Sequence, residues 1–262
     1  GNGVEEDYAA NPEKVKDKIA LVYLGVLPGS KPGTPGLHRS EKTAIATKYG
    51  AKGIIVINTP PNGVLLTGTA SVTGKLIPIP AVCVGKEDGL LLKEQLAKGK
   101  LVSRIKMTNF SGMIKARNVV ATLKGKTLAN EKIVIGGHLD SWDVNEGAHD
   151  DGAGVVQTIE VLRTMKALHY QPKHTIRFVL FANEENGMRG GNKYADLAKE
   201  NKEQHIFALE SDEGGFTPRA IGITCSADQL KKFQSWNSLL KPYGTEVTAG
   251  GGGADIGPLA KV

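Results

Sequence analysis

The residues from Ile133 to Asp151 read Ile-Val-Ile-Gly-Gly-His-Leu-Asp-Ser-Trp-Asp-Val-Asn-Glu-Gly-Ala-His-Asp-Asp. An apolar, strand-like run leads into His138 and Asp140, and a turn then leads into two further acids at the expected start of a helix. Two later apolar runs also end in acids, at Asn183-Glu-Glu-Asn-Gly187 and at Leu209-Glu-Ser-Asp212. This order predicts strands whose carboxyl ends carry the chemistry.

Around this stretch, apolar runs alternate with segments of helical periodicity. We expect strands at 119–123, 132–136, 175–182, 205–210 and 220–224, and a strand-like segment at 246–249. We expect helices at 154–168, at about 190–200, and from Ser226 to near Gly244 with Gln229 completing a capping box. The first helix should bury Val155, Ile159, Leu162 and Met165. The pattern predicts an α/β fold, a three-layer sandwich around a mixed, mostly parallel sheet.

The composition changes near residues 108–116, which predicts two domains, at 1–112 and 113–262. The first reads as a smaller α/β unit. Its expected strands are 19–24, 53–58, 77–84 and 101–107, and its expected helices are 41–49 and 86–97. Pro78 and Pro80 mark the third strand as an edge strand.

The composition excludes several classes of protein. The net charge of +6 comes from single lysines spread over residues 1–112, so we expect a solvated surface and no nucleic-acid partner. No apolar run approaches the ~18 residues that a membrane span needs. Cys83 and Cys225 each lie in an apolar run and are expected to be buried free thiols.

His138 and Asp140 are the first candidate site residues. They lie two positions apart, so both side chains share one face if the strand continues. That spacing suits a metal-binding imidazole whose second ring nitrogen is oriented by a carboxylate. Asp150 and Asp151 stand where one acid can cap a helix while the other binds metal.

Glu184 and Glu185 form the second candidate pair. Neighbours on an extended chain point to opposite sides, so one can bind metal while the other acts as general base. Asp212 is the third acid at a strand end, and Glu210 and Glu213 compete with it for that role.

Imidazole and carboxylate ligands around an open coordination position are typical of catalytic zinc, which supplies a nucleophile near neutral pH. The sequence contains no Gly-x-Ser-x-Gly elbow, no phosphate-binding loop and no Cys-x-x-Cys motif. The candidate residues therefore favour a metal-dependent hydrolase over nucleophilic or nucleotide chemistry.

These residues resemble the co-catalytic di-zinc exopeptidase family, which includes bacterial leucyl aminopeptidases. The likeness is carried by Gly137 to Val144, by Asp150-Asp-Gly152, by the Glu184–Glu185 pair, by Glu210-Ser-Asp212 and by Gly251 to Ile256. It points to a subgroup that bears a carboxypeptidase name and has an inserted protease-associated domain, which residues 1–112 resemble.

The resemblance implies a role for each residue. His138 would bind one zinc with Asp212, Asp150 would bridge two zinc ions, and Glu185 would bind the second. Glu184 would be the general base and Asp140 a further catalytic residue. A cis peptide between Asp150 and Asp151 is also implied.

The resemblance further implies a zinc-dependent exopeptidase acting on short peptides or dipeptides, in a secreted, lysosomal or periplasmic location. The sequence departs from the family pattern in two ways. The chain starts within the inserted domain, and it stops before the histidine that completes the second zinc site. We therefore expect an internal piece of a longer enzyme. The alternative is a non-catalytic or inactive fragment that acts as a binding or interaction module, and a homodimer is left open.

Overall fold

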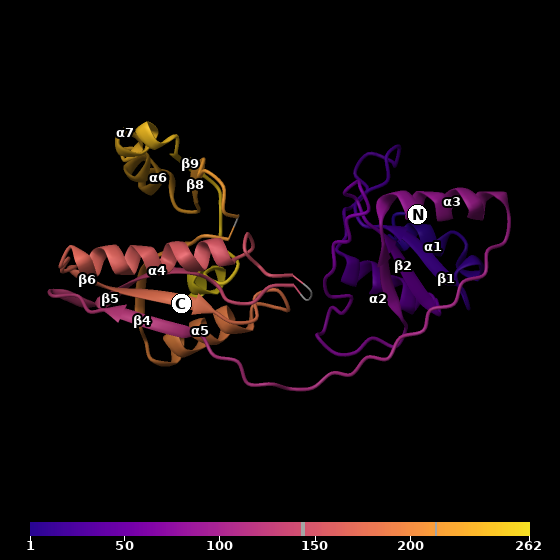
Figure 1. Cartoon of the computed structure of the whole chain (residues 1–262), viewed down its shortest axis with the longest axis horizontal. Coiled ribbons are helices and arrows are strands. Elements are labelled where there is room, and N and C mark those ends of the chain that lie inside the picture. The colour runs from indigo at the N-terminus through magenta and orange to yellow at the C-terminus, as the bar shows by residue number, and fades with distance from the viewer. Residues whose placement is uncertain (143–144, 213) are drawn as a thin grey trace. The chain divides into compact units, whose positions relative to one another are not determined.

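The computed structural model describes residues 1–142, 145–212 and 214–262, and the chain forms two compact units, Gly1–Ile114 and Lys115–Val262 (Figure 1). Among the described residues, no helix is both long enough and apolar enough to cross a bilayer.

The first unit is built on a parallel sheet of order β1-β2-β3, with strands Ile19–Tyr23, Gly53–Ile57 and Ala81–Val84. Its helices are α1 (Glu5–Ala9), the short η1 (Pro12–Lys14), α2 (Arg39–Lys48) and α3 (Lys86–Lys98). Ile54 and Val56 pack with Ala46 of α2, whereas Gly89 of α3 lies against Ile57. Because alternate residues of a strand face opposite sides, the two helices cover opposite faces of β2.

The second unit holds a four-stranded sheet of order β4-β6-β5-β7. Its strands are β4 (Val119–Leu123), β5 (Leu128–His138), β6 (His174–Phe181) and β7 (Gln204–Glu210). Strand β4 runs antiparallel to β6, and the other neighbours are parallel. This confirms the mixed, mostly parallel sheet.

Helices α4 (Gly152–Ala167) and α5 (Arg189–Glu200) complete the layers. Val134, Val179 and Phe181 form a core with Tyr194 of α5, whereas Gly137 lies under the first turn of α4. Positions 134 and 137 of one strand face opposite sides, so the helices cover the two faces of the sheet and the layers are those expected.

The rest of the second unit is a two-stranded parallel sheet of β8 (Ala220–Ile223) and β9 (Glu246–Ala249) with short helices. The helices are α6 (Ala227–Gln234), α7 (Asn237–Leu240), η2 (Lys241–Tyr243) and η3 (Gly257–Lys261). Ser226 and Gln229 form the predicted capping box. The prediction of a single helix from Ser226 to near Gly244 is wrong. Helix α6 ends at Gln234, and Pro242 lies in the tighter final turn, η2.

Three further expectations are wrong. Residues 101–107 form no strand, and Val102 is 89% exposed, because no described strand edge pairs with them. Ile159 is 50% exposed, since Gly154 and Thr158 are the buried residues of α4. Both cysteines are free as expected, but Cys83 is only half-buried and Cys225 is exposed.

Candidate metal centre

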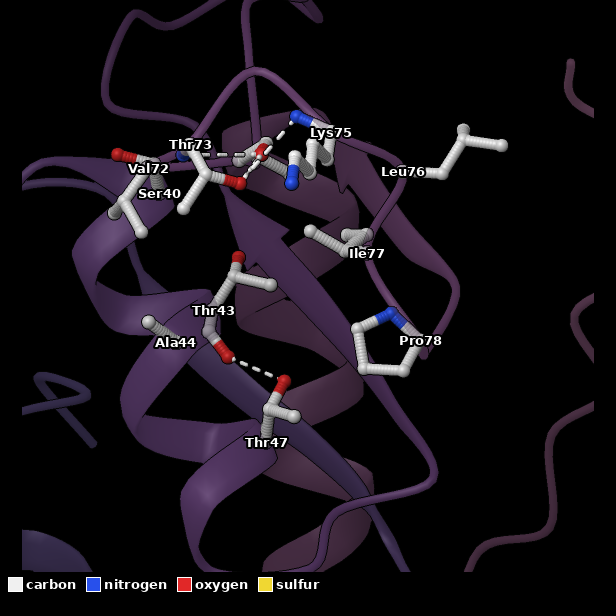
Figure 2. Close-up of a pocket in the computed structure, with 12 residues that line it drawn as sticks. Ser40, Thr43, Ala44, Thr47, Val72, Thr73, Lys75, Leu76, Ile77 and Pro78 are labelled. Carbon is white, nitrogen blue, oxygen red and sulfur yellow. Dashed lines mark hydrogen bonds between the residues drawn. The ribbon is translucent and has the colours of Figure 1, made fainter. Parts of the chain in front are cut away.

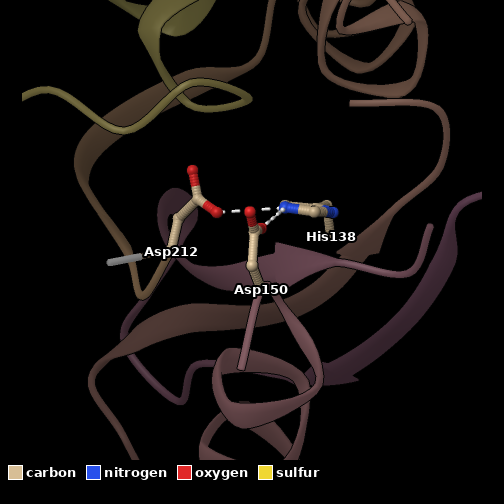
Figure 3. A group of neighbouring side chains, drawn as sticks. All are labelled: His138, Asp150 and Asp212. Carbon is tan, nitrogen blue, oxygen red and sulfur yellow. Dashed lines mark hydrogen bonds and ion pairs between the residues drawn. The ribbon is translucent and has the colours of Figure 1, made fainter. Parts of the chain in front are cut away.

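Three predicted ligands meet at one edge of the main sheet (Figure 3). His138 is the last residue of β5, and Asp212 follows the end of β7, which lies beside β5 in parallel. Asp150 stands two residues before α4. Carboxyl ends of parallel strands meet at the same edge, so the topology brings together residues that are 74 positions apart.

The ligand atoms are close enough to share one ion. His138 Nε2 lies 3.1 Å from Asp150 Oδ1 and 3.0 Å from Asp212 Oδ1, and one atom from each residue lies within 4.8 Å of the others. The His138 side chain is 1% exposed, whereas those of Asp150 and Asp212 are 49% and 26% exposed. One imidazole and two carboxylates with an open side fit a catalytic zinc ion.

The charges of the cluster also fit a cation. Burial lowers the pKa of His138, but the hydrogen bond and charge of Asp212 outweigh it and raise that pKa to about 10. In the absence of metal, the protonated imidazole carries the positive charge that stabilises the neighbouring carboxylates. A zinc ion would take the place of that proton.

The backbone fixes the orientation of the imidazole. His138 Nδ1 lies 2.8 Å from the carbonyl oxygen of Asp140, which can only accept, so Nδ1 keeps its proton in both the charged and the neutral imidazole and Nε2 faces the cluster. The sequence pattern assigned this contact to the carboxylate of Asp140, but Oδ1 is 3.8 Å from Nδ1. The carboxylate accepts instead from the backbone N–H groups of Glu184 (2.9 Å) and Glu185 (3.3 Å).

Asp151 is the acid of the pair that caps the helix. Its side chain accepts from Gly154 N at 3.0 Å and from His138 N at 2.8 Å, so it joins the start of α4 to the end of β5. Burial raises the pKa of its carboxyl to about 6. The Asp150–Asp151 peptide is cis, as the resemblance implied.

Gly154 gives a first testable prediction, because a methyl group there would lie 1.9 Å from Ser211 O and 2.4 Å from Asp151 Oδ1. Ala normally stabilises a helix over Gly by ~0.5–1 kcal/mol. Here we expect Gly154→Ala to lower the free energy of unfolding by about 2 kcal/mol or more, since the chain beside Asp212 has to move. Urea unfolding measures this.

The matched control is Gly112→Ala, because no atom lies within 4 Å of a methyl group placed at Gly112. Unchanged or increased stability of the Gly154 variant would refute the close approach.

Glu184 and Glu185 lie in a turn after β6, which ends at Phe181, so the extended geometry expected for the pair is wrong. Asn183 adopts a φ of 65° and bends the chain there. Burial, with smaller contributions from the charges of Asp212, Asp255 and Glu185, raises the pKa of Glu184 to about 7.

Burial and the charge of Asp150 also raise the pKa of Glu185, and its buried Oε1 has no hydrogen-bond partner. A buried carboxylate oxygen without a hydrogen-bond partner is suited to bind a cation. Neither glutamate belongs to the three-residue cluster among the described residues. Glu213, a competitor for the role of Asp212, lies outside those residues.

Two further acids are coupled to the cluster by charge; Asp255 was missed, whereas Glu210 was a competitor for the role of Asp212. Asp255, which is fully buried, accepts from Gly191 N at 3.0 Å, and its Oδ2 has no partner. Glu210 accepts from the backbone N–H groups of Asp255 and Ile256 rather than joining Asp212, and burial raises its pKa to about 8. Residues 251–256 were part of the family resemblance. Asp255 was not predicted as a site residue, because it neither directly follows an expected strand nor lies at a ligand-like spacing from another candidate.

Asp255 gives a second prediction, for the metal-free protein. Burial raises its pKa from 3.8 to about 6. The folded state then binds more protons than the unfolded state between these values, so stability falls as pH rises through that window. Asp255→Asn keeps the acceptor for Gly191 N. Between pH 5 and 8 it should lose about 1 kcal/mol less stability than the wild type.

Urea unfolding of both proteins at the two pH values, in the presence of a chelator, measures this difference. Equal losses would show that Asp255 is already ionised at pH 5.

A separate pocket of about 240 Å³ lies in the first unit, between α2 and residues 70–78 (Figure 2). Hydroxyl-bearing side chains and one lysine contribute to its lining: Ser40, Thr43, Thr47, Ser71, Thr73 and Lys75. None of the predicted site residues lines it.

Comparisons with known proteins agree with these observations. The chain matches carboxypeptidase Q of Bos taurus with 32% identity over 224 residues, 84% of this chain and 48% of the relative. It is 30% identical to aminopeptidase YwaD of Bacillus subtilis over 225 residues, 86% of this chain and 43% of the relative. The chain thus spans about half the length of the curated relatives it matches.

Solved structures show the same fold. A peptidase M28 precursor from Shewanella amazonensis superposes with a TM-score of 0.76 and 28% identity, covering 94% of this chain and 58% of that one. A zinc aminopeptidase from Bacillus subtilis gives a TM-score of 0.65 and 25% identity, covering 99% of this chain and 60% of that one. The PA domain family matches residues 1–92, and peptidase family M28 matches residues 118–255. The chain belongs to peptidase family M28.

Proposed function

We propose that this chain carries the metal centre of a zinc-dependent exopeptidase that hydrolyses short peptides or dipeptides. The observation that carries the proposal is the cluster of His138, Asp150 and Asp212 with Glu184 beside it. Similarity to carboxypeptidase Q and to zinc aminopeptidases supports it. In this proposal residues 113–262 are the peptidase domain and residues 1–112 the protease-associated domain.

In the proposed centre, His138, Asp150 and Asp212 would hold a first zinc ion, and Asp150 and Glu185 would be ligands of a second. When bound, zinc polarises the scissile carbonyl and lowers the pKa of water. The short distances from His138 Nε2 to Asp150 Oδ1 and Asp212 Oδ1 support the first set of ligands. The lack of a hydrogen-bond partner at Glu185 Oε1 supports the second set.

Glu184 is the proposed general base. Its pKa of about 7 suits a group that accepts a proton from the attacking water and returns it to the leaving amine at neutral pH. Asp140 positions this base, because its carboxylate accepts from the backbone N–H groups of Glu184 and Glu185. It thereby ties the base to the end of β5, where the ligand His138 lies.

Hydrolysis of leucyl dipeptides by the purified chain tests the proposal. Release of free amino acids should stop with a chelator and return with added zinc. Hydrolysis that resists chelation, or failure of the chain to bind zinc, would contradict the proposal. Zinc binding with no hydrolysis of any peptide would instead favour the alternative, a non-catalytic or inactive fragment that acts as an interaction module.

The direction of cleavage needs a second comparison. The relatives include enzymes named as aminopeptidases and as carboxypeptidases. An aminopeptidase recognises a free amino terminus, so N-acetylation of a dipeptide should abolish its hydrolysis. Equal hydrolysis of the acetylated form would assign carboxypeptidase action. A secreted, lysosomal or periplasmic location completes the proposal and follows from the family resemblance alone.

A further inference from the structure

The segment from Ala182 to Gly190 carries Glu184 and leads from β6 into the first turn of α5. We call this segment the Glu184 loop. Its two ends lie side by side, because Gly190 N donates to the carbonyl oxygen of Ala182 at 2.9 Å. Within the loop, Met188 N donates to the carbonyl oxygen of Glu184 at 2.9 Å. The loop is therefore a closed turn, and its shape depends on how its two ends are joined.

Asn118 joins the same two ends with its side chain. This half-buried residue directly precedes β4, which lies beside β6 in the sheet. Its Nδ2 donates to the carbonyl oxygen of Gly190 at 2.9 Å, and its Oδ1 accepts from Ala182 N at 3.0 Å. A carboxamide carries both a donor and an acceptor, which is what these two backbone groups require. One side chain thus completes the pairing that the backbone begins.

The backbone passes very close to this side chain. A methyl group at Gly190 would lie 2.4 Å from Asn118 Oδ1 and 2.6 Å from Ala182 N, so only glycine fits where the loop closes. The next residue, Gly191, donates its N–H to the fully buried Asp255. The start of α5 is therefore held at two consecutive residues by side chains that lie outside this helix.

Asn118 and Asp140 hold different parts of the Glu184 loop. Asp140 accepts from the backbone N–H groups of Glu184 and Glu185 in its middle, whereas Asn118 ties its ends together. Asp140 follows β5 and Asn118 precedes the antiparallel β4, and these two strands flank β6. The loop that follows β6 is thus braced from both neighbouring strands.

We propose that Asn118 is a positioning residue for peptide hydrolysis, which holds Glu184 in place at the metal cluster by bridging the two ends of its loop. This inference rests on the proposed function. The two hydrogen bonds of Asn118 go to backbone groups of the loop, so its effect on the reaction passes through the loop. A displacement of a reacting group by about 1 Å can cost ~100-fold in rate, even when the mutation lies far from the chemistry.

The first test is Asn118→Ala, with hydrolysis of a leucyl dipeptide measured at saturating zinc. We expect kcat to fall by about 10–100-fold, while KM changes by less than about threefold. Zinc per chain should stay unchanged, because His138, Asp150 and Asp212 lie outside the loop. Elemental analysis measures the zinc content and also shows that the variant has folded its metal centre.

The Glu184→Gln background separates positioning from general support of the fold. If Asn118 acts through Glu184, adding Asn118→Ala to Glu184→Gln should lower kcat by less than about twofold more. A residue that only stabilises the fold would lower kcat by the same factor in both backgrounds. The four kcat values of the wild type, the two single variants and the double variant complete this cycle.

Two further variants sharpen the result. Asn118→Asp has nearly the same size and keeps the acceptor for Ala182 N, but its ionised form cannot donate to Gly190 O. It should therefore also lower kcat. Asn201→Ala is the matched control, since Asn201 is an exposed asparagine at the opposite end of α5. It should leave kcat unchanged.

A wild-type kcat in Asn118→Ala or in Asn118→Asp would overturn the inference and leave the proposed function intact. Equal losses in the two backgrounds would also overturn it, as would a loss of zinc in proportion to the loss of activity. If the wild-type chain shows no zinc-dependent hydrolysis, the proposed function fails and this inference fails with it.

Discussion

Replacing Glu184 by Gln is expected to lower kcat for dipeptide hydrolysis by about 10²–10⁴-fold, the usual contribution of a general acid–base group. The amide has nearly the same size but cannot accept the proton of the attacking water. Zinc content should stay unchanged, because Glu184 is not among the residues assigned to either ion. Steady-state kinetics combined with elemental analysis measures both quantities.

The dependence of activity on pH tests the same role of Glu184. A base works only when deprotonated, so the activity of the wild type should rise with pH through the pKa of Glu184, which burial places near 7 in the metal-free protein. Bound zinc will lower that pKa and move the rise to lower pH. Glu200→Gln, at an exposed position of α5, is the matched control. Equal activity in the Glu184 variant would remove this residue from the mechanism.

Replacing Asp150 by Ala is expected to weaken zinc binding by more than about 100-fold, since it removes the one carboxylate assigned to both ions, and loss of even an outer partner costs 10–100-fold. Zinc should then no longer raise the melting temperature. The metal-free variant should fold, because the Asp150 side chain is half-exposed and its contact with His138 Nε2 is shared with Asp212, which remains. Competition with a chromophoric chelator measures the affinity.

Asp196→Ala provides the control, because Asp196 is an exposed acid on α5. Zinc affinity within a few-fold of the wild type in the Asp150 variant would mean that the ion binds elsewhere.

The three ligands proposed for the first zinc ion were predictable from two regularities of α/β folds. Apolar runs predicted β5 and β7, which pair in parallel, and parallel strands gather their carboxyl ends at one edge. His138 and Asp212 follow from that topology, and the acid-rich start of α4 adds Asp150. Which acid of the Asp150–Asp151 pair caps the helix stayed open, because both positions suit an N-cap.

Contacts between the backbone and side chains were not predictable. The partner of His138 Nδ1 is a carbonyl oxygen, and the carboxylate of Asp140 turns to the backbone of Glu184, because the chain bends at Asn183. Residues 101–107 alternate like a strand, but no strand of the described part of the chain pairs with them. Periodicity reports which residues prefer one face, and it does not report whether a neighbouring strand exists.

The most direct test of the account is a crystal structure of the zinc-soaked chain, with anomalous scattering recorded at the zinc edge. We predict a peak about 2.0–2.1 Å from His138 Nε2 and within 2.0–2.2 Å of an oxygen of both Asp150 and Asp212. An anomalous peak elsewhere, or no peak at this cluster in zinc-saturated crystals, would contradict the claim that these three residues form the metal centre.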